Sequence, residues 1–178
     1  MTPRLLAIAA HVPQGSRVAD IGADHARLAM WLARHKGCKC IATDKNPNPL
    51  NAAKTRIEAY GNTNDIDFRL GDGLSCISTD EVDVIIIAGM GGETISGILD
   101  LKLWVKNKLC ILQPNTHPER LKVFLIKNGY NFNSEQTVLE RNRKYTIIVA
   151  GATDIGRPRD TEGGVPCIKT IGGFDHEH

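Results

Sequence analysis

The sequence predicts an α/β domain built on a mostly parallel sheet of seven strands, with helices on both faces of the sheet. The first reason is that short β-branched apolar runs alternate with longer amphipathic stretches up to about residue 150, a rhythm typical of repeated strand-helix-strand units. The second is that two late strand-like runs, FNSEQTVLE and KYTIIVAG, are separated only by residues 141–143, too few for a crossover helix. We therefore expect parallel strands that end in a C-terminal antiparallel hairpin.

The expected elements follow one another in a regular order along the chain. A helix over residues 3–12 precedes the first strand. Strands are expected over the apolar runs at 17–21, 39–43, 66–70, 83–88 and 109–113. Helices are expected over the amphipathic stretches that follow them, at 25–36, 48–60, 92–106 and 117–128. Right-handed crossovers then place these helices on both faces of the sheet.

Length and composition indicate one domain, since the chain has 178 residues, of which 42% are hydrophobic and 24% charged. We expect this domain over residues 1–150. Residues 151–178 are rich in Gly, Pro and charge, so we expect an irregular tail there, with Pro166–Ile171 as its one strand-like run. The N-terminus lacks a signal-like arrangement and no apolar run reaches eighteen residues. We therefore expect a cytoplasmic protein with no membrane segment, and no feature points to an obligatory protein partner.

Cysteines and net charge exclude little. The five cysteines, at positions 38, 40, 76, 110 and 167, form an odd set that we expect to be reduced thiols. Neither the Cys-Lys-Cys pair nor the terminal Asp-His-Glu-His run has the spacing of a metal site, so we expect no metal. The net charge of +2 does not by itself mark a nucleic-acid-binding protein. Residues 102–145, with nine Lys or Arg against three Glu, suit either a phosphate-facing surface or ordinary solvated helix faces.

The turn after the first strand carries two carboxylates around a glycine. Ligands of open α/β sheets bind at the carboxyl ends of the strands, and residues 20–24 occupy the first such turn. Gly22 lets the backbone approach a ligand closely, and Asp24 is placed to cap the next helix. Asp20 and Asp24 disfavour a pyrophosphate and suit a cationic ligand, such as the amino and sulfonium groups of S-adenosylmethionine. The alternative is a turn aspartate and a helix cap without a ligand.

Two further turns at strand ends carry acids. Asp44 ends the second strand, where a carboxylate can bind both ribose hydroxyls of either NAD or S-adenosylmethionine. Asp72 lies between Gly71 and Gly73 just past the third strand, where it can accept from an adenine amino group, although two glycines also make an ordinary turn. Together the three acidic turns predict a cofactor that contains adenosine.

The fourth and fifth strands end in small residues and in amides. Residues 88–92, AGMGG, permit close approach of the backbone to a ligand, or else they relieve helix-sheet packing. Gln113 and Asn115 flank Pro114 after the fifth strand, and such amides can bind the edge of an adenine through a donor and an acceptor. No serine stands in a nucleophile-elbow sequence, so we do not expect a hydrolase.

Three stretches resemble one known family. VADIGADHARLAMWL, DEVDVIIIAGMGG and LQPN, in this order and spacing, are similar to the bacterial tRNA (adenine-N1)-methyltransferases that act on adenine 22, the TrmK family. The resemblance covers roughly residues 3–150. It implies the Rossmann-like fold of class I methyltransferases, with S-adenosylmethionine as cofactor and tRNA as partner. Methyl transfer would then be direct in-line attack of ring nitrogen 1 of the adenine.

The resemblance also implies the site residues. Those implied to bind the cofactor are Arg4, Asp20, Gly22, Asp24, His25, Asp44, Lys45, Gly71, Asp72, Gly73, Ala88, Gly89, Met90, Gly91 and Gly92, with Arg4 reaching the cofactor carboxylate. Those implied to hold the target base, and so to be catalytic, are Gln113, Pro114 and Asn115.

Two departures from the family keep other functions open. The family usually reads Asp-His-Ala-Tyr-Leu-Pro where this chain has Arg27 in place of Tyr and Ala29 in place of Pro. Family members also continue into a helical segment that helps to grip tRNA, whereas residues 151–178 show no heptad pattern. The alternatives are a non-catalytic module that binds S-adenosylmethionine or RNA, and a methyltransferase with another substrate. A nicotinamide-dependent reductase would explain Asp44 but not the acidic first turn.

Overall fold

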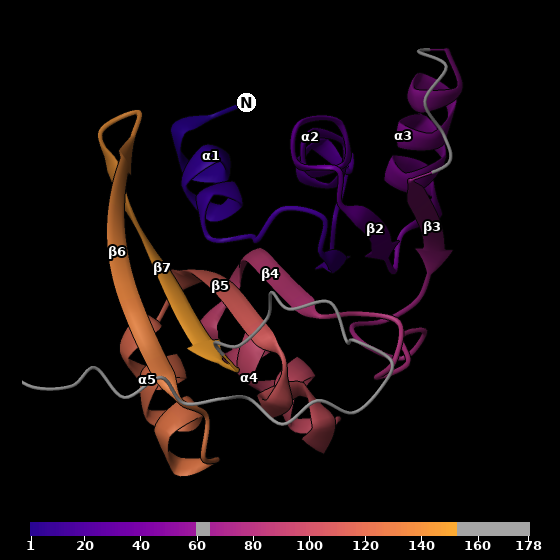
Figure 1. Ribbon diagram of the computed structural model, residues 1–178. Helices are drawn as coiled ribbons and strands as arrows, with labels where there is room; N and C mark the ends of the chain where they lie inside the picture. Colours follow the sequence, from indigo (N-terminus) through magenta and orange to yellow (C-terminus); the bar gives the residue numbers. More distant parts are fainter. Residues whose placement is uncertain (60–64, 153–178) are drawn as a thin grey trace, which may run out of the picture.

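The computed structural model describes residues 1–59 and 65–152, and these residues form one seven-stranded sheet between two helical layers (Figure 1). The strands are β1 (Arg17–Ile21), β2 (Lys39–Asp44), β3 (Ile66–Leu70), β4 (Val84–Gly91), β5 (Leu109–Thr116), β6 (Phe132–Glu140) and β7 (Arg143–Gly151). The helices are α1 (Pro3–Ala10), α2 (Arg27–Lys36), α3 (Pro47–Ala59), α4 (Gly92–Asp100), the 3-10 helix η1 (Leu103–Asn107) and α5 (Pro118–Lys127).

The order of the strands in the sheet is β3-β2-β1-β4-β5-β7-β6. Strands β1 to β5 are parallel, whereas β7 runs antiparallel to both β5 and β6. The predicted fold is therefore confirmed. Because the chain moves outward from β1 to β3 and then returns to β4 on the other side of β1, the topology switches between β1 and β4, and ligands of such sheets bind at the carboxyl ends there.

The hairpin of β6 and β7 is tighter than expected. Glu140 pairs with Arg143, so the loop holds only Arg141 and Asn142, whose φ angles are +48° and +62°. Two consecutive positive φ angles are typical of a type I′ turn, whose twist matches that of the strands. The turn therefore lies at the carboxyl end of β5, since β7 runs antiparallel to β5.

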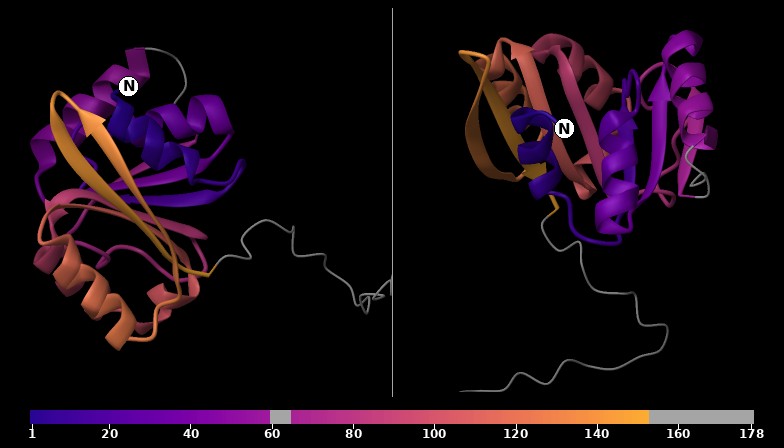
Figure 2. Two further views of the ribbon diagram at one scale, coloured as in Figure 1. Left: turned by 90° about the vertical axis from the view of Figure 1, so that its left-hand side faces the viewer. Right: turned by 90° about the horizontal axis from the view of Figure 1, so that it is seen from above.

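The sheet buries one apolar cluster on each face. α1, α2 and α3 cover one face, while α4, α5 and η1 cover the other (Figure 2). Successive residues of β4 alternate between the two clusters, with Ile86 in the first and Ile85 and Ile87 in the second. A strand that is buried on both faces reads as a continuous β-branched run, as the VIII of β4 does.

Several element boundaries differ from the predictions. The single helix expected over 92–106 is split into α4 and η1, because Lys102 has an extended backbone (φ −140°, ψ 99°). The break leaves Leu101 and Leu103 exposed and turns Val105 into the core. β4 continues past Ala88 to Gly91 with two register shifts. The expected tail, with its strand-like run at 166–171, lies outside the described residues from 153 onward, and so does Cys167.

Within residues 1–59 and 65–152, no helix is long and apolar enough to cross a membrane. The same described residues contain no group of three or more His, Cys, Asp or Glu side chains that could hold a metal ion. Cys38, Cys40, Cys76 and Cys110 are free thiols.

Candidate active site

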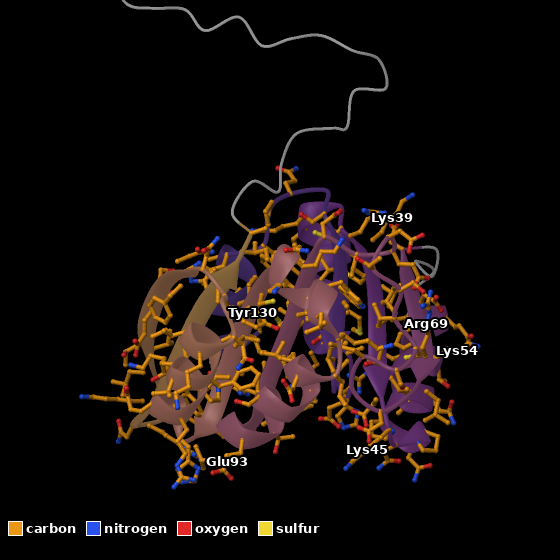
Figure 3. The ribbon with its side chains drawn as sticks, turned by 90° about the horizontal axis from the view of Figure 1, so that it is seen from below. Lys39, Lys45, Lys54, Arg69, Glu93 and Tyr130 are labelled. Carbon is orange, nitrogen blue, oxygen red and sulfur yellow. The ribbon has the colours of Figure 1, made fainter. Side chains whose placement is uncertain are left out.

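Hydrogen bonds join the turns at the carboxyl ends of the parallel strands into one surface. Ala23 N donates to Thr43 O over 2.8 Å, and Asp24 N donates to Asp44 Oδ2 over 3.1 Å, which ties the turn after β1 to the end of β2. Gly71 N donates to Asp44 O over 3.0 Å and ties in the turn after β3. Figure 3 shows Lys45 and Glu93, which follow β2 and β4, at this edge of the sheet and Lys39, at the start of β2, at the opposite edge. The three acidic turns predicted from sequence are thus neighbours.

The prediction that Asp24 caps α2 is wrong. The helix begins at Arg27, its N-cap residue is Ala26 in a left-handed conformation, and no side chain caps it from that position. Asp24 lies two residues before this cap, and its side chain is 70% exposed. Asp20, and not Asp24, accepts a hydrogen bond from the first turn of α2, and the donor is the backbone N–H of Ala29. The Asp24 carboxylate is therefore left facing solvent at the edge of the site, with His25 Nε2 3.9 Å from its Oδ1.

Asp20 is a buried residue of β1, directly before the turn that carries Gly22 and Asp24. Burial raises its pKa to about 7, the bond from Ala29 opposes this rise, and the nearby charge of Asp44 adds to it. A carboxyl with a raised pKa gains most from a nearby cation, because the cation offsets the lost hydration of the ionised form. Thr43, also fully buried, has a hydroxyl oxygen with no hydrogen-bond partner among the described residues. Both groups are suited to a polar, positively charged ligand.

Asp44 is held in one orientation by two backbone amides. Its Oδ1 accepts from Asn46 N over 2.9 Å, and its Oδ2 accepts from Asp24 N. Each carboxylate oxygen has two acceptor positions, so one remains on each. The Asp44 side chain can therefore still accept two hydroxyl groups side by side. Lys45 follows it as an exposed residue.

Glycines bring the backbone close to neighbouring groups in two places. A Cβ on Gly22, whose φ is +69°, would lie 2.1 Å from Met90 Cε, so the tip of the Met90 side chain covers the turn after β1. A Cβ on Gly92 would lie 2.6 Å from the backbone oxygen of His117, which holds the start of α4 directly against the chain after β5. Among the other predicted cofactor residues, Asp72 is exposed between Gly71 and Gly73 just after β3. Gly89 is exposed and lies with Ala88 and Gly91 in the last residues of β4.

The amides after β5 form a connected network. Gln113 is fully buried, and its Nε2 donates to Pro114 O over 2.9 Å and to Asn115 Oδ1 over 3.2 Å. Asn115 is exposed, and its Nδ2 donates to Gly89 O over 2.7 Å. Gln113 has both of its N–H groups engaged within the protein, whereas Asn115 keeps one N–H and one oxygen lone pair free. Only Asn115 of this pair presents its amide to the surface.

Arg4 contacts this network through Gln113. Its Nη1 donates to Gln113 Oε1, and its guanidinium carbon lies 5.0 Å from the centre of the Tyr145 ring. Its Nε is buried and has no partner among the described residues. The turn at Gly89 is close by, since a Cβ on Gly89 would lie 3.7 Å from Arg4 Nη1. The structure thus brings Arg4 to the site, in contact with Gln113.

Two residues of the hairpin belong to the site and were missed from the sequence. Arg143 Nη2 donates to Asn115 O over 3.3 Å, and the Arg143 guanidinium carbon lies 5.2 Å from the centre of the Tyr145 ring. The signal was available, because an antiparallel β7 beside β5 must bring its first residues to the carboxyl end of β5. Residues 143 and 145, two positions apart, share one face of that strand.

Comparisons with known proteins agree with this geometry. The family described as "Methyltransferase domain" matches residues 1–148. The Bacillus subtilis (strain 168) tRNA (adenine(22)-N(1))-methyltransferase is 39% identical over 158 residues, which are 86% of this chain and 66% of that protein. The crystal structure of the B. subtilis m1A22 tRNA methyltransferase TrmK superposes with a TM-score of 0.79 at 35% identity, over 86% of this chain and 67% of that one. The chain belongs to the tRNA (adenine(22)-N(1))-methyltransferase family.

Another solved structure of this family contains a cofactor. The Streptococcus pneumoniae protein Sp1610, a putative tRNA (m1A22) methyltransferase solved in complex with S-adenosyl-L-methionine, has a TM-score of 0.80 at 34% identity, over 89% of this chain and 76% of that one. This chain spans between 60% and 66% of the length of the curated relatives that it matches. The predicted family membership is confirmed.

Proposed function

We propose that this chain transfers the methyl group of S-adenosylmethionine to N1 of an adenine in tRNA, at position 22. Its partner is then tRNA and its place of action the cytoplasm. The observation that carries the proposal is the exposed amide of Asn115, held by Gln113 and Gly89 beside three carboxylate-bearing turns. The names of the relatives in the family support the same reaction.

The residues at the strand ends fit S-adenosylmethionine. The two free acceptor positions of Asp44 suit the two ribose hydroxyls, and the exposed Asp72 suits an adenine amino group. Asp20 and Asp24 supply negative charge for a cationic amino acid moiety and would repel a pyrophosphate, which disfavours NAD. When bound, S-adenosylmethionine supplies a methyl group on a positively charged sulfur. Gly89 is exposed, and the nearest atom to a Cβ placed there would be Arg4 Nη1 at 3.7 Å, so the backbone at Gly89 is open to close approach by this group.

Asn115 is the residue that we assign to the target base. Its Oδ1 has one free lone pair and can accept from the 6-amino group of adenine. N1 of adenine carries no proton, so its own lone pair forms the new bond to carbon as the bond from that carbon to sulfur breaks, and no general base is needed. The positive charge left on the base strengthens the hydrogen bond to Oδ1. This preorganised acceptor stabilises the transition state more than the ground state.

Gln113 and Arg4 act through Asn115. Gln113 fixes which way the Asn115 amide points, because its N–H donates to Oδ1 and thereby leaves Nδ2 for Gly89 O. Arg4 in turn fixes the Gln113 amide by donating to its oxygen. The target adenine must leave its helical stack to reach such an amide.

The proposal is tested with S-adenosylmethionine labelled in its methyl group and two unmodified tRNA transcripts, one with adenine and one with guanine at position 22. Label in the adenine transcript alone is the expected result. Calorimetric titrations with S-adenosylmethionine and with NAD accompany this assay. Tight binding of S-adenosylmethionine with no label in either transcript would contradict the proposal and favour a non-catalytic module or another substrate.

A further inference from the structure

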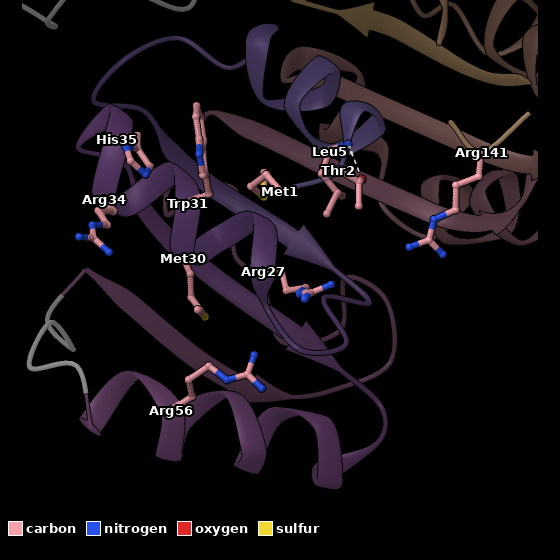
Figure 4. A pocket seen from close by; sticks show the side chains of 10 residues that line it. All are labelled: Met1, Thr2, Leu5, Arg27, Met30, Trp31, Arg34, His35, Arg56 and Arg141. Carbon is pink, nitrogen blue, oxygen red and sulfur yellow. Dashed lines mark hydrogen bonds between the residues drawn. The ribbon is translucent and has the colours of Figure 1, made fainter. Parts of the chain in front are cut away.

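A pocket of about 470 Å³ lies on the helical face that carries α1, α2 and α3, beside the tip of the hairpin (Figure 4). Its polar lining comes from three helices or their ends and from the hairpin turn. Arg27, Arg34 and His35 belong to α2, Arg56 belongs to α3, and Arg141 belongs to the turn between β6 and β7. The volume falls in the range of roughly 300–1,000 Å³ that is typical of ligand sites.

The charges that line this pocket are all of one sign. It is lined by four arginines and one histidine, and no Asp or Glu is among its lining residues. None of the four arginines forms an ion pair with a residue in the described part of the chain. Three arginines elsewhere do form ion pairs, namely Arg17, Arg69 and Arg120, and Arg69 Nη2 lies 2.8 Å from Glu81 Oε1. Arg141 interacts electrostatically with Glu140, its neighbour in the chain. Guanidinium groups that line one cavity repel each other, and an anion with several oxygens would offset that repulsion.

The pocket also has an aromatic wall. Trp31, half-buried on α2, packs against the ring of His35 one turn later, with the ring centres 4.8 Å apart. The side chains of Met30 and Leu5 lie in the same lining. A flat apolar wall beside cationic groups is the combination that binds a nucleobase together with its phosphate. A simple inorganic anion would use only the arginines.

The pocket adjoins the site that holds Asn115. Arg27 is the first residue of α2 and comes directly after the turn that carries Asp24. Arg141 is separated by one residue from Arg143, whose side chain donates to Asn115 O. The backbone of Arg4 also donates to Glu140 at the end of β6, over 2.9 Å, which ties the start of α1 to the hairpin tip. A polynucleotide with a base at Asn115 can therefore continue into the pocket.

We propose that this pocket binds a nucleotide of the substrate RNA next to the target adenine, with its phosphates on Arg34, Arg56 and Arg141 and its base against Trp31. The identity of that RNA as tRNA rests on the proposed function. The pocket itself requires only an RNA strand with an unstacked base.

The test is the affinity of the full chain for a fluorescent tRNA transcript without S-adenosylmethionine, measured by anisotropy at several salt concentrations. The double variant Arg34→Glu, Arg56→Glu is expected to weaken binding by at least about tenfold and to lower the slope of log Kd against log salt by about 2, one for each lost phosphate contact. The control for the effect of a charge reversal is Lys39→Glu, because Lys39 is exposed at the opposite edge of the sheet (Figure 3). It is expected to change neither quantity. S-adenosylmethionine affinity should be the same in all three proteins.

The aromatic wall is tested by Trp31→Ala, for which RNA affinity should fall by about 5- to 100-fold. Trp31→Phe, which keeps a flat ring and the packing of α2, should keep most of the affinity. Equal losses for the double variant and for Lys39→Glu would show a non-specific charge effect and overturn the proposal. Equal competition by polyglutamate would show a general anion site and overturn it as well. If the wild-type chain binds RNA through these residues but methylates no RNA, the proposed function is wrong and the assignment of the pocket holds. If the wild-type chain methylates tRNA and the double variant binds RNA as tightly as wild type, the proposed function holds and the assignment of the pocket is wrong.

Discussion

Gln113 Nε2 donates to Asn115 Oδ1 over 3.2 Å, which joins a fully buried amide to an exposed one. The buried member has both of its N–H groups engaged within the protein, whereas the exposed member presents a free N–H and a free oxygen lone pair at the surface. We therefore assign contact with the target base to Asn115 and the orientation of that contact to Gln113.

Replacing the exposed amide should abolish most catalysis. Asn115→Ala removes the acceptor for the adenine amino group, so kcat should fall by about 10²-fold, with S-adenosylmethionine affinity unchanged. Single-turnover methylation and calorimetry measure the two quantities. The control is Asn128→Ala, since Asn128 is the C-cap residue at the far end of α5 and its side chain donates to Phe124 O. A wild-type rate in Asn115→Ala would show that another group holds the base.

Replacing the buried amide should separate catalysis from folding. Gln113→Glu keeps an oxygen that accepts from Arg4 but removes the N–H groups that reach Pro114 O and Asn115 Oδ1. We expect kcat to fall by about tenfold with little change in stability. Gln113→Leu should instead lower the free energy of unfolding by about 1–3 kcal/mol, because it leaves the Arg4 donor without a partner. Urea denaturation and steady-state kinetics distinguish the two variants, and equal kinetics for Gln113→Glu and wild type would refute the positioning role.

The buried carboxyl of Asp20 should make both stability and cofactor binding depend on pH. Its pKa is about 7 in the folded chain, against an ordinary value of 3.8, so the folded state binds more protons between these two values. The free energy of unfolding should thus fall as pH rises from about 4 to 7, by about 4 kcal/mol from this group alone. Asp20→Asn should remove this dependence and be the more stable protein at pH 8.

The same group predicts the direction for the cofactor. A cation favours the ionised carboxyl, so S-adenosylmethionine should bind more weakly as pH falls below 7 and should release a proton on binding there. Calorimetry in buffers of different ionisation enthalpy detects that proton. Binding of S-adenosylmethionine by Asp20→Asn with wild-type affinity and wild-type pH dependence would show that Asp20 does not sense the ligand.

Two glycines of α4 provide a matched test of the close approach at its start. Gly92→Ala would place a methyl group 2.6 Å from the backbone oxygen of His117, so we expect a loss of about 1–3 kcal/mol in the free energy of unfolding. Gly97 lies in the same helix, and a Cβ there would meet nothing within 4 Å. Gly97→Ala should therefore raise the free energy of unfolding by about 0.5–1 kcal/mol. Urea denaturation of both variants measures the contrast, and equal effects would mean that α4 can shift away from β5.

The sequence predicted the sheet well because each strand is a short β-branched run closed by a turn. The ends of helices were predicted less well where the backbone conformation of one or two residues determines the boundary. Lys102 is extended and splits the expected fourth helix, and nothing in its residue type requires this. Asp24 has the residue type of a helix cap, but the left-handed residues Asp24 and Ala26 delay the helix, and Asp20 receives an amide of α2 in its place.

The residues of the candidate site likewise fall into those that the sequence predicts and those that it does not. The acidic turns could be predicted because strand ends in a parallel sheet must lie together. The side chains that come from the hairpin could not be ranked from a motif, since Arg143 and Tyr145 reach the site only through the antiparallel register of β7 against β5. Gln113 and Asn115 are equivalent amides in the sequence, and only the structure shows that Gln113 is buried while Asn115 is exposed.

The nature of the methylated nucleoside is the first measurement to make. Unmodified tRNA is incubated with the full chain and S-adenosylmethionine, digested, and analysed for methylated adenosines by mass spectrometry. An acceptor at Asn115 for the 6-amino group, with attack by the unprotonated N1, predicts 1-methyladenosine. The 1-methyladenosine should lie at position 22 of the tRNA. N6-methyladenosine, which requires loss of a proton from the amino group, would contradict the assignment of Asn115 and the direct attack by N1.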